Sequence, residues 1–201
     1  MELVNLKPIP IYKENVNLSL SKEELSLLKN LEFYNENGFY ITKDSNIFNN
    51  NKFDKIKKLM NKKANLYKDK ILEIKNEIYL TQSWATINKK GSSHFMHKHP
   101  NTFISVVYYV SCKDGVLFFD LHKSQLEEGF NFAYTIENFN VYNSTNWKVY
   151  VKTGDIVIFP GWIHHKSLIN DYETDKFLIG CNYFIKGELG SKSTYSQIII
   201  N

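Results

Sequence analysis

The stretch His97–Ser111, HKHPNTFISVVYYVS, joins two histidines to a run rich in Val, Ile and Tyr. Thr102–Ser111 predicts a β-strand, because β-branched and aromatic residues pack well on a pleated surface. His97 and His99 lie two positions apart, and residues at this spacing on an extended chain point to the same face. Two imidazoles on one face can bind one metal ion without bending the backbone. The stretch therefore predicts a pair of metal ligands beside a strand.

Most of the chain after residue 78 has the same strand-forming composition, and several of its segments are bounded by turn residues such as Lys113-Asp114-Gly115. Many short strands with no helices between them favour an antiparallel sandwich or barrel. The other predicted strands are Tyr79–Asn88, Val116–Leu121, Trp147–Val151, Ile156–Phe159, Phe177–Ile185 and Tyr195–Ile200.

The first 78 residues have a different, more helical pattern. Ser21-Lys22-Glu23-Glu24 predicts a capping box that opens a short helix ending near Leu31. Phe39–Ile41 is a candidate short strand, and apolar residues spaced three and four apart predict a long amphipathic helix from Asn49 to Ile74. We expect one domain, 1–201, with a helical segment 1–78 and a β core 79–201. The Asn-rich segment 123–146 is expected to be a lid or a long loop.

Composition restricts the class of function. The 201 residues are 43% hydrophobic, which is typical of a globular protein. The net charge is +4, and all 25 basic residues are lysine. Sequence-specific readers of nucleic acid rely on arginine, so its absence argues against a nucleic-acid partner. No apolar run is long enough for a membrane span, no signal peptide is apparent, and the two cysteines form no CxxC motif. A cytoplasmic location is expected.

A second pair, His164-His165, follows the turn residues Pro160 and Gly161. A third imidazole from this pair would complete a set on one side of a metal and leave positions open for water or substrate. Such an open set is typical of catalytic sites, and imidazole suits iron, zinc, copper or nickel. His94, by contrast, is expected to be a structural residue.

The order of motifs resembles the small 2-oxoglutarate/Fe(II)-dependent oxygenases of bacteria and phages. The resemblance covers roughly residues 80–185 and is carried by an ordered set of segments. They are Trp84–Gly91, His97–Asn101, Ser105–Val110, Gly115–Phe119, Gly154–His165 and Lys176–Asn182.

The resemblance implies a double-stranded β-helix, a jelly-roll barrel that is mostly β, with the N-terminal helices packed on it. In the family, a His-x-His-Pro-Asn motif and a histidine six residues after the Phe of Phe-Pro-x-Trp bind Fe(II). These positions match His97, His99 and His165. The superfamily usually has an acidic residue at the position of His99. A basic residue about ten positions beyond the last histidine pairs with 2-oxoglutarate, and Lys176 occupies this place with a less directional cation than the usual arginine.

Two further residues are candidates for binding the cosubstrate. The resemblance places Asn88 where related oxygenases direct an amide at 2-oxoglutarate, and the hydroxyl of Tyr109 could donate to a carboxylate. The implied reaction consumes O2 and 2-oxoglutarate and hydroxylates a C–H bond of a small-molecule or peptide substrate. A homodimer is the general expectation for a soluble protein of this kind.

Two alternatives remain open from the residues. The same three histidines could serve a cupin-like metalloenzyme that does not use 2-oxoglutarate, because three-histidine iron sites occur in other dioxygenases. A non-enzymatic jelly roll with a binding or structural role is the third interpretation. The role of Lys176 separates the 2-oxoglutarate-dependent oxygenase from the cupin-like metalloenzyme, since only a 2-oxoglutarate enzyme needs its charge.

Overall fold

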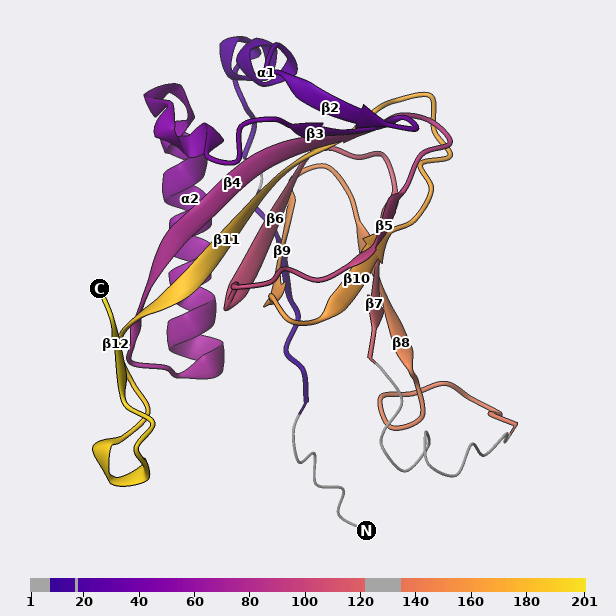
Figure 1. Ribbon diagram of the computed structural model, residues 1–201. Helices are drawn as coiled ribbons and strands as arrows, with labels where there is room; N and C mark the ends of the chain where they lie inside the picture. Colours follow the sequence, from indigo (N-terminus) through magenta and orange to yellow (C-terminus); the bar gives the residue numbers. More distant parts are fainter. Residues whose placement is uncertain (1–7, 17, 122–134) are drawn as a thin grey trace.

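The computed structural model describes residues 8–16, 18–121 and 135–201. Its elements form two antiparallel sheets and two α-helices (Figure 1). The helical elements are α1 (Lys22–Lys29), α2 (Asp54–Tyr67), the 3₁₀ turns η1 (Ile47–Asn49), η2 (Asn51–Phe53) and η4 (Lys192–Thr194), and the π-helical turn η3 (Lys68–Leu72). The strands are β1 (Tyr12–Asn15), β2 (Phe33–Glu36), β3 (Phe39–Thr42), β4 (Glu77–Asn88), β5 (His94–His97), β6 (Ile104–Ser111), β7 (Gly115–Asp120), β8 (Asn146–Val151), β9 (Asp155–Pro160), β10 (His164–Ser167), β11 (Lys176–Leu189) and β12 (Ile198–Ile200).

The large sheet has the strand order β1-β9-β6-β11-β4-β3-β2, and β12 pairs with β11 away from this path. The small sheet has the order β5-β10-β7-β8. The strands of both sheets pair in antiparallel fashion. The expected mostly-β jelly roll is confirmed, although the two sheets stay separate and do not close into a barrel.

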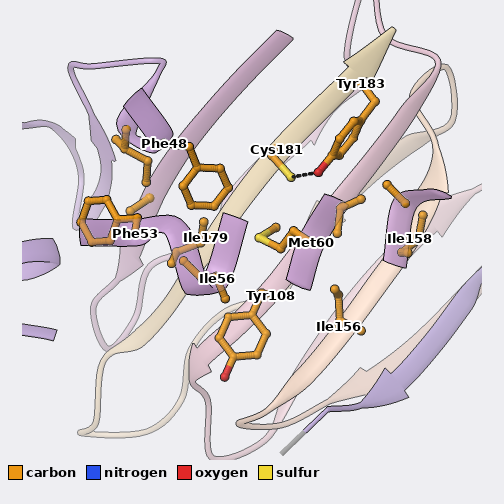
Figure 2. Close-up of a cluster of buried hydrophobic side chains, with 14 of the residues drawn as sticks. Phe48, Phe53, Ile56, Met60, Tyr108, Ile156, Ile158, Ile179, Cys181 and Tyr183 are labelled. Atoms are coloured by element: carbon orange, nitrogen blue, oxygen red, sulfur yellow. Dashed lines mark hydrogen bonds between the residues drawn. The ribbon is translucent and has the colours of Figure 1, made fainter. Parts of the chain in front are cut away.

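Alternation along the central strands gives the large sheet two buried faces, because successive side chains of a strand point to opposite sides. One face packs against α2, whose buried residues Ile56, Met60 and Ala64 lie four positions apart (Figure 2). Full burial of a side chain such as Ile56 or Met60 contributes about 1.5–3 kcal/mol. The sheet residues in this cluster include Tyr108, Ile156, Ile158, Ile179, Cys181 and Tyr183.

The opposite face of the large sheet packs against the small sheet. Its buried apolar cluster comprises Val107, Tyr109, Val157 and Phe159 from the large sheet and Leu117, Phe119 and Val151 from the small one, together with Cys112 and Ile163. This second face is the one that also carries the candidate site residues of β4 and β11, since Asn88 is paired with Lys176 and Leu178 with Tyr109.

The N-terminal residues form both helices and strands. Ser21 caps α1 with the expected capping box, in which its hydroxyl accepts from the Glu24 N–H. The predicted long helix is shorter than its apolar pattern, because 3₁₀ turns precede Asp54 and a π-helical turn follows Tyr67. The strands β1, β2 and β3 join the large sheet at its two ends.

Two predicted features differ in their details. The last predicted strand, from Tyr195, is reduced to β12, because Lys192–Thr194 forms a 3₁₀ turn and Tyr195 adopts a positive φ of 53°. Much of the predicted lid or loop 123–146 lies outside the described residues.

Among the described helices, none is both long and apolar enough to cross a membrane.

Candidate metal centre

Three histidines from two distant parts of the chain meet between the two sheets. The ligand-capable nitrogens of His97, His99 and His165 all lie within 4.8 Å of one another. His165 on β10 is the direct cross-strand partner of His97 on β5. His164, next to it, points to the other face and is paired with Asp120. The structure therefore selects His165 from the histidine doublet.

His99 reaches the group from a turn and not from a strand. The strand β5 ends at His97, so the expected i, i+2 pair on one strand is only half realised. The backbone N–H of His99 donates to the carbonyl of Gly161 at 2.9 Å, which ties this turn to the β9–β10 connection. Asn101, two residues on, takes a left-handed φ of 54° that turns the chain toward β6.

The hydrogen bonds of the three rings fix their tautomers. The Nδ1 atoms of His97 and His165 lie 2.8 and 3.0 Å from the carbonyl oxygens of Phe95 and Ile163, and a carbonyl can only accept. Both rings therefore carry the proton on Nδ1 and present an unprotonated Nε2.

A polar network fixes the tautomer of His99 as well. Its Nδ1 lies 2.7 Å from Asn182 Oδ1 and 2.7 Å from Ser105 Oγ, while the Ser105 hydroxyl donates to Asn182 Oδ1. The Asn182 amide nitrogen donates in turn to Gln82 Oε1, which fixes the amide oxygen toward His99. His99 must therefore donate from Nδ1, and such partners orient a ligand ring and raise its basicity.

These tautomers leave lone pairs that face one another. The Nε2 atoms of His97 and His99 are 3.2 Å apart, and neither carries a proton to share. Two ligands at about 2.1 Å on perpendicular axes of one ion lie about 3 Å apart, which is close to this separation. A cation between the rings turns this repulsion into coordination, so the three residues fit a metal ion.

Burial keeps the rings neutral. It lowers the pKa of His99 to about 4 and that of His165 to about 2, and it also lowers the pKa of His97. The neighbouring imidazoles lower the pKa of His165 further. Neutral imidazole is the form that binds metals, so the site requires no deprotonation near pH 7.

Aromatic side chains surround the group and limit its hydration. The rings of Phe159 and Phe119 lie 4.6 and 6.1 Å from the ring of His165. Trp84 meets His99 edge-on at 5.5 Å. Its indole lies over Gly180, where an added Cβ would approach the ring to 2.6 Å, so only glycine leaves room for it.

Lys176 lies further along the same face of β11. It is 3% exposed, and its ammonium donates to the Ser167 hydroxyl and to the Leu168 carbonyl at 3.2 Å. None of the ion pairs within residues 8–16, 18–121 and 135–201 involves it. Burial lowers its pKa below the ordinary value. A buried cation without a counter-ion is costly, which points to an anionic ligand.

Asn88 is the cross-strand partner of Lys176, and its side-chain amide lacks hydrogen-bond partners among the described residues. It is 1% exposed, and neither its Nδ2 nor its Oδ1 has a hydrogen-bond partner within the described part of the chain. Buried amides are almost always satisfied, so this orphaned group indicates a bound ligand or water that accepts from its N–H. Tyr109 is buried on β6 opposite Leu178 of β11, and burial raises the pKa of its hydroxyl.

Sequence reasoning missed one contributor. His94, expected to be structural, packs beside the site: it stacks on Phe39 at 4.1 Å and lies 4.0 Å from His97, and burial lowers its pKa to about 3. Asn182, which orients His99, was not singled out, although it lies six residues after Lys176 on the same face of β11. That even spacing is the signal that could have identified it.

A jelly roll that gathers three imidazoles between its sheets, beside a buried lysine that forms no ion pair among the described residues, fits a metal-dependent enzyme of the double-stranded β-helix class. Residues 82–182, about half of the chain, match the family described as "Putative 2OG-Fe(II) oxygenase". The chain belongs to this family, and its cofactors are Fe(II) and the cosubstrate 2-oxoglutarate.

Solved structures agree on the fold. An oxidoreductase of the 2OG-Fe(II) oxygenase family from Burkholderia pseudomallei has a TM-score of 0.60 at 12% identity, covering 87% of this chain and 84% of its own. HygX from Streptomyces hygroscopicus, with nickel and 2-oxoglutarate bound, has a TM-score of 0.60 at 12% identity, covering 88% and 83%. The epimerase SnoN from nogalamycin biosynthesis has a TM-score of 0.58 at 12% identity, covering 88% and 78%. No curated protein matches the chain in sequence.

Proposed function

We propose that the protein is a hydroxylase of a small molecule, with His97, His99 and His165 as the iron ligands. The observation that carries the ligand assignment is the convergence of three Nε2 lone pairs, two of them 3.2 Å apart. The group contains no carboxylate, so it is uncharged before the metal binds. A dianionic cosubstrate then balances the 2+ charge of the ion.

We assign the far carboxylate of 2-oxoglutarate to Lys176, with Asn88 beside it. Lys176 is held by Ser167 and Leu168, so its ammonium is positioned before the ligand arrives. Asn88 can donate to a carboxylate oxygen from an amide that has no other partner among the described residues. We assign to Tyr109 a second donor role from β6, next to Leu178 on β11.

When bound, iron and 2-oxoglutarate together supply the reduction of O2, with succinate and CO2 as co-products and one oxygen atom delivered to a C–H bond. The chain's own residues provide orientation and exclude water. Asn182 and Ser105 hold the His99 ring, and Trp84 shields its edge. Phe119 and Phe159 keep the His165 side of the site apolar.

An isotope experiment tests this function. The iron-loaded protein is incubated with 2-oxoglutarate and an extract of small metabolites under ¹⁸O2, and the products are analysed by mass spectrometry. A hydroxylase places one labelled atom in succinate and one in a new product, which is 2 Da heavier than under ¹⁶O2. Labelled succinate without a labelled product would reject hydroxylation in favour of another 2-oxoglutarate-dependent outcome, such as epimerisation.

A further inference from the structure

A hollow lies beside the metal centre, between the β2–β3 hairpin and the β4–β5 connection. Its volume is about 270 Å³, slightly below the range usual for drug-sized ligands. The β2–β3 wall comes from residues that precede the family match at residue 82. The lining residues are Glu36, Asn37, Phe39, Gly91, Ser92, Ser93 and Phe95.

Two aromatic side chains connect the hollow to the iron ligands. The Phe39 ring stacks on His94 at 4.1 Å, and His94 lies 4.0 Å from His97, so Phe39 is within about 8 Å of His97. Phe95 lies 5.5 Å from the His97 ring on another side. The hollow is therefore separated from the His97 ring by single side chains, His94 on one side and Phe95 on the other.

Strand register separates this hollow from the cosubstrate position. Glu36 is paired with Phe39, Phe39 with Asn88, and Asn88 with Lys176, so the four residues form one row across the sheet. Neighbouring strands are about 4.8 Å apart, which puts the two ends of the row roughly 14 Å from each other. A cosubstrate held at Lys176 and Asn88 leaves the Glu36 end of the row available.

The charge at the Glu36 end is negative. Glu36 is the one ionisable residue of the lining, it is exposed, and it takes part in no ion pair within the described residues. The nearby cations Lys89 and Lys90 are paired with Asp175 and Glu173. The carboxylate is therefore not neutralised locally, although the whole chain has a net charge of +4.

We propose that the hollow binds the primary substrate through a cationic amine, placed between the Glu36 carboxylate and the ring of Phe95. Phe95 is 61% exposed, and an open aromatic face beside a carboxylate attracts an ammonium group. The Asn37 amide and the Ser93 hydroxyl offer hydrogen bonds to polar groups of the same molecule. This inference rests on the proposed function, since it places the substrate beside the assigned iron ligands.

Calorimetric titration tests the inference. Protein loaded anaerobically with Fe(II) and 2-oxoglutarate is titrated with cadaverine, spermidine and glucosamine, and with a counterpart of each in which every amine is acetylated and therefore uncharged. At least one amine should bind, and its acetylated form should bind about fivefold more weakly. Glu36→Gln should weaken the binding of that amine about three- to fivefold, as expected for one partly exposed charge pair. Glu36→Lys should weaken it more than tenfold, because like charges repel.

The matched control is Glu32→Gln. Glu32 lies just before β2 and is bonded to Lys43, outside the hollow, so amine binding should not change. Equal affinity for amines and acetylated forms, equal effects of the Glu36 and Glu32 variants, or no binding of any amine would each overturn the inference. The Glu36→Gln sample should retain wild-type 2-oxoglutarate binding. If the wild type does not bind 2-oxoglutarate, the proposed function fails, while titration of the protein with amines alone still tests the hollow.

Discussion

Replacing Lys176 by methionine tests two effects of the buried ammonium separately. One is its effect on the stability of the ligand-free protein, and the other is its contribution to the binding of 2-oxoglutarate. The substitution keeps an unbranched side chain of similar length and removes the ammonium. Lys176 is 3% exposed, and its recorded partners are two neutral oxygens. Dehydrating an ammonium costs several kcal/mol. Two charge-assisted hydrogen bonds recover about 1.5–3 kcal/mol each.

These opposing contributions nearly cancel, so the free energy of unfolding of the ligand-free variant should equal that of the wild type or exceed it by up to about 2 kcal/mol. Binding should change far more. Loss of one partner of a buried charge pair costs about 2–5 kcal/mol, which corresponds to a Kd for 2-oxoglutarate raised roughly 30-fold or more.

Two measurements on the same samples check this pair of results. Chemical denaturation without ligand gives the free energy of unfolding, and anaerobic calorimetry with Fe(II) gives the Kd for 2-oxoglutarate. Lys148→Met should leave both values unchanged, because Lys148 is exposed. A Kd within fivefold of wild type would refute the assignment of Lys176. A destabilised variant with the same Kd would make Lys176 a purely structural residue.

Further predictions concern pH, ligand orientation and packing. Burial lowers the pKa of Lys176 below its unfolded value, so the ligand-free protein should become more stable as pH rises from that lowered pKa toward 10.5. The affinity for 2-oxoglutarate should fall over the same pH range, because the ammonium loses its proton. Denaturation and calorimetry at stepped pH measure the two trends, and a stability or affinity that does not change with pH contradicts the prediction. Asn182→Ala should lower metal affinity about 10–100-fold by freeing the His99 ring, whereas Gln82→Ala, one bond further out, should change it only a few-fold in metal-competition titrations. Gly180→Ala should cost about 1–3 kcal/mol of stability through its clash with Trp84, and adding Trp84→Leu should recover most of that loss in thermal melts; an unrecovered loss would place the strain elsewhere.

The sequence predicted the sheet strands that are long and rich in β-branched residues, because local composition suffices for them. It missed β5 and β10, each only four residues long and carrying the histidines themselves. It also missed β1 and β2, whose membership of the sheet depends on pairing with distant strands. Tertiary contacts decide such elements, and a local pattern does not contain them.

The part of the candidate site that depends on residue type and spacing was predictable from the sequence. His97, His99 and His165 were named from motifs, and the structure brings their nitrogens together. The pairing of Asn88 with Lys176 depends on the register of two strands that are far apart in the sequence. The position of His94 depends equally on contacts across the fold, in this case with Phe39.

The most direct test of the central claim is an anaerobic titration of the Fe(II)-loaded wild type with 2-oxoglutarate, monitored by visible absorption. The account predicts a weak metal-to-ligand charge-transfer band that saturates at one equivalent. The band should be absent from His99→Ala protein, in which one of the three converging nitrogens is missing. Iron binding without a band would contradict the use of 2-oxoglutarate at this site, and failure to bind iron would contradict the ligand assignment itself.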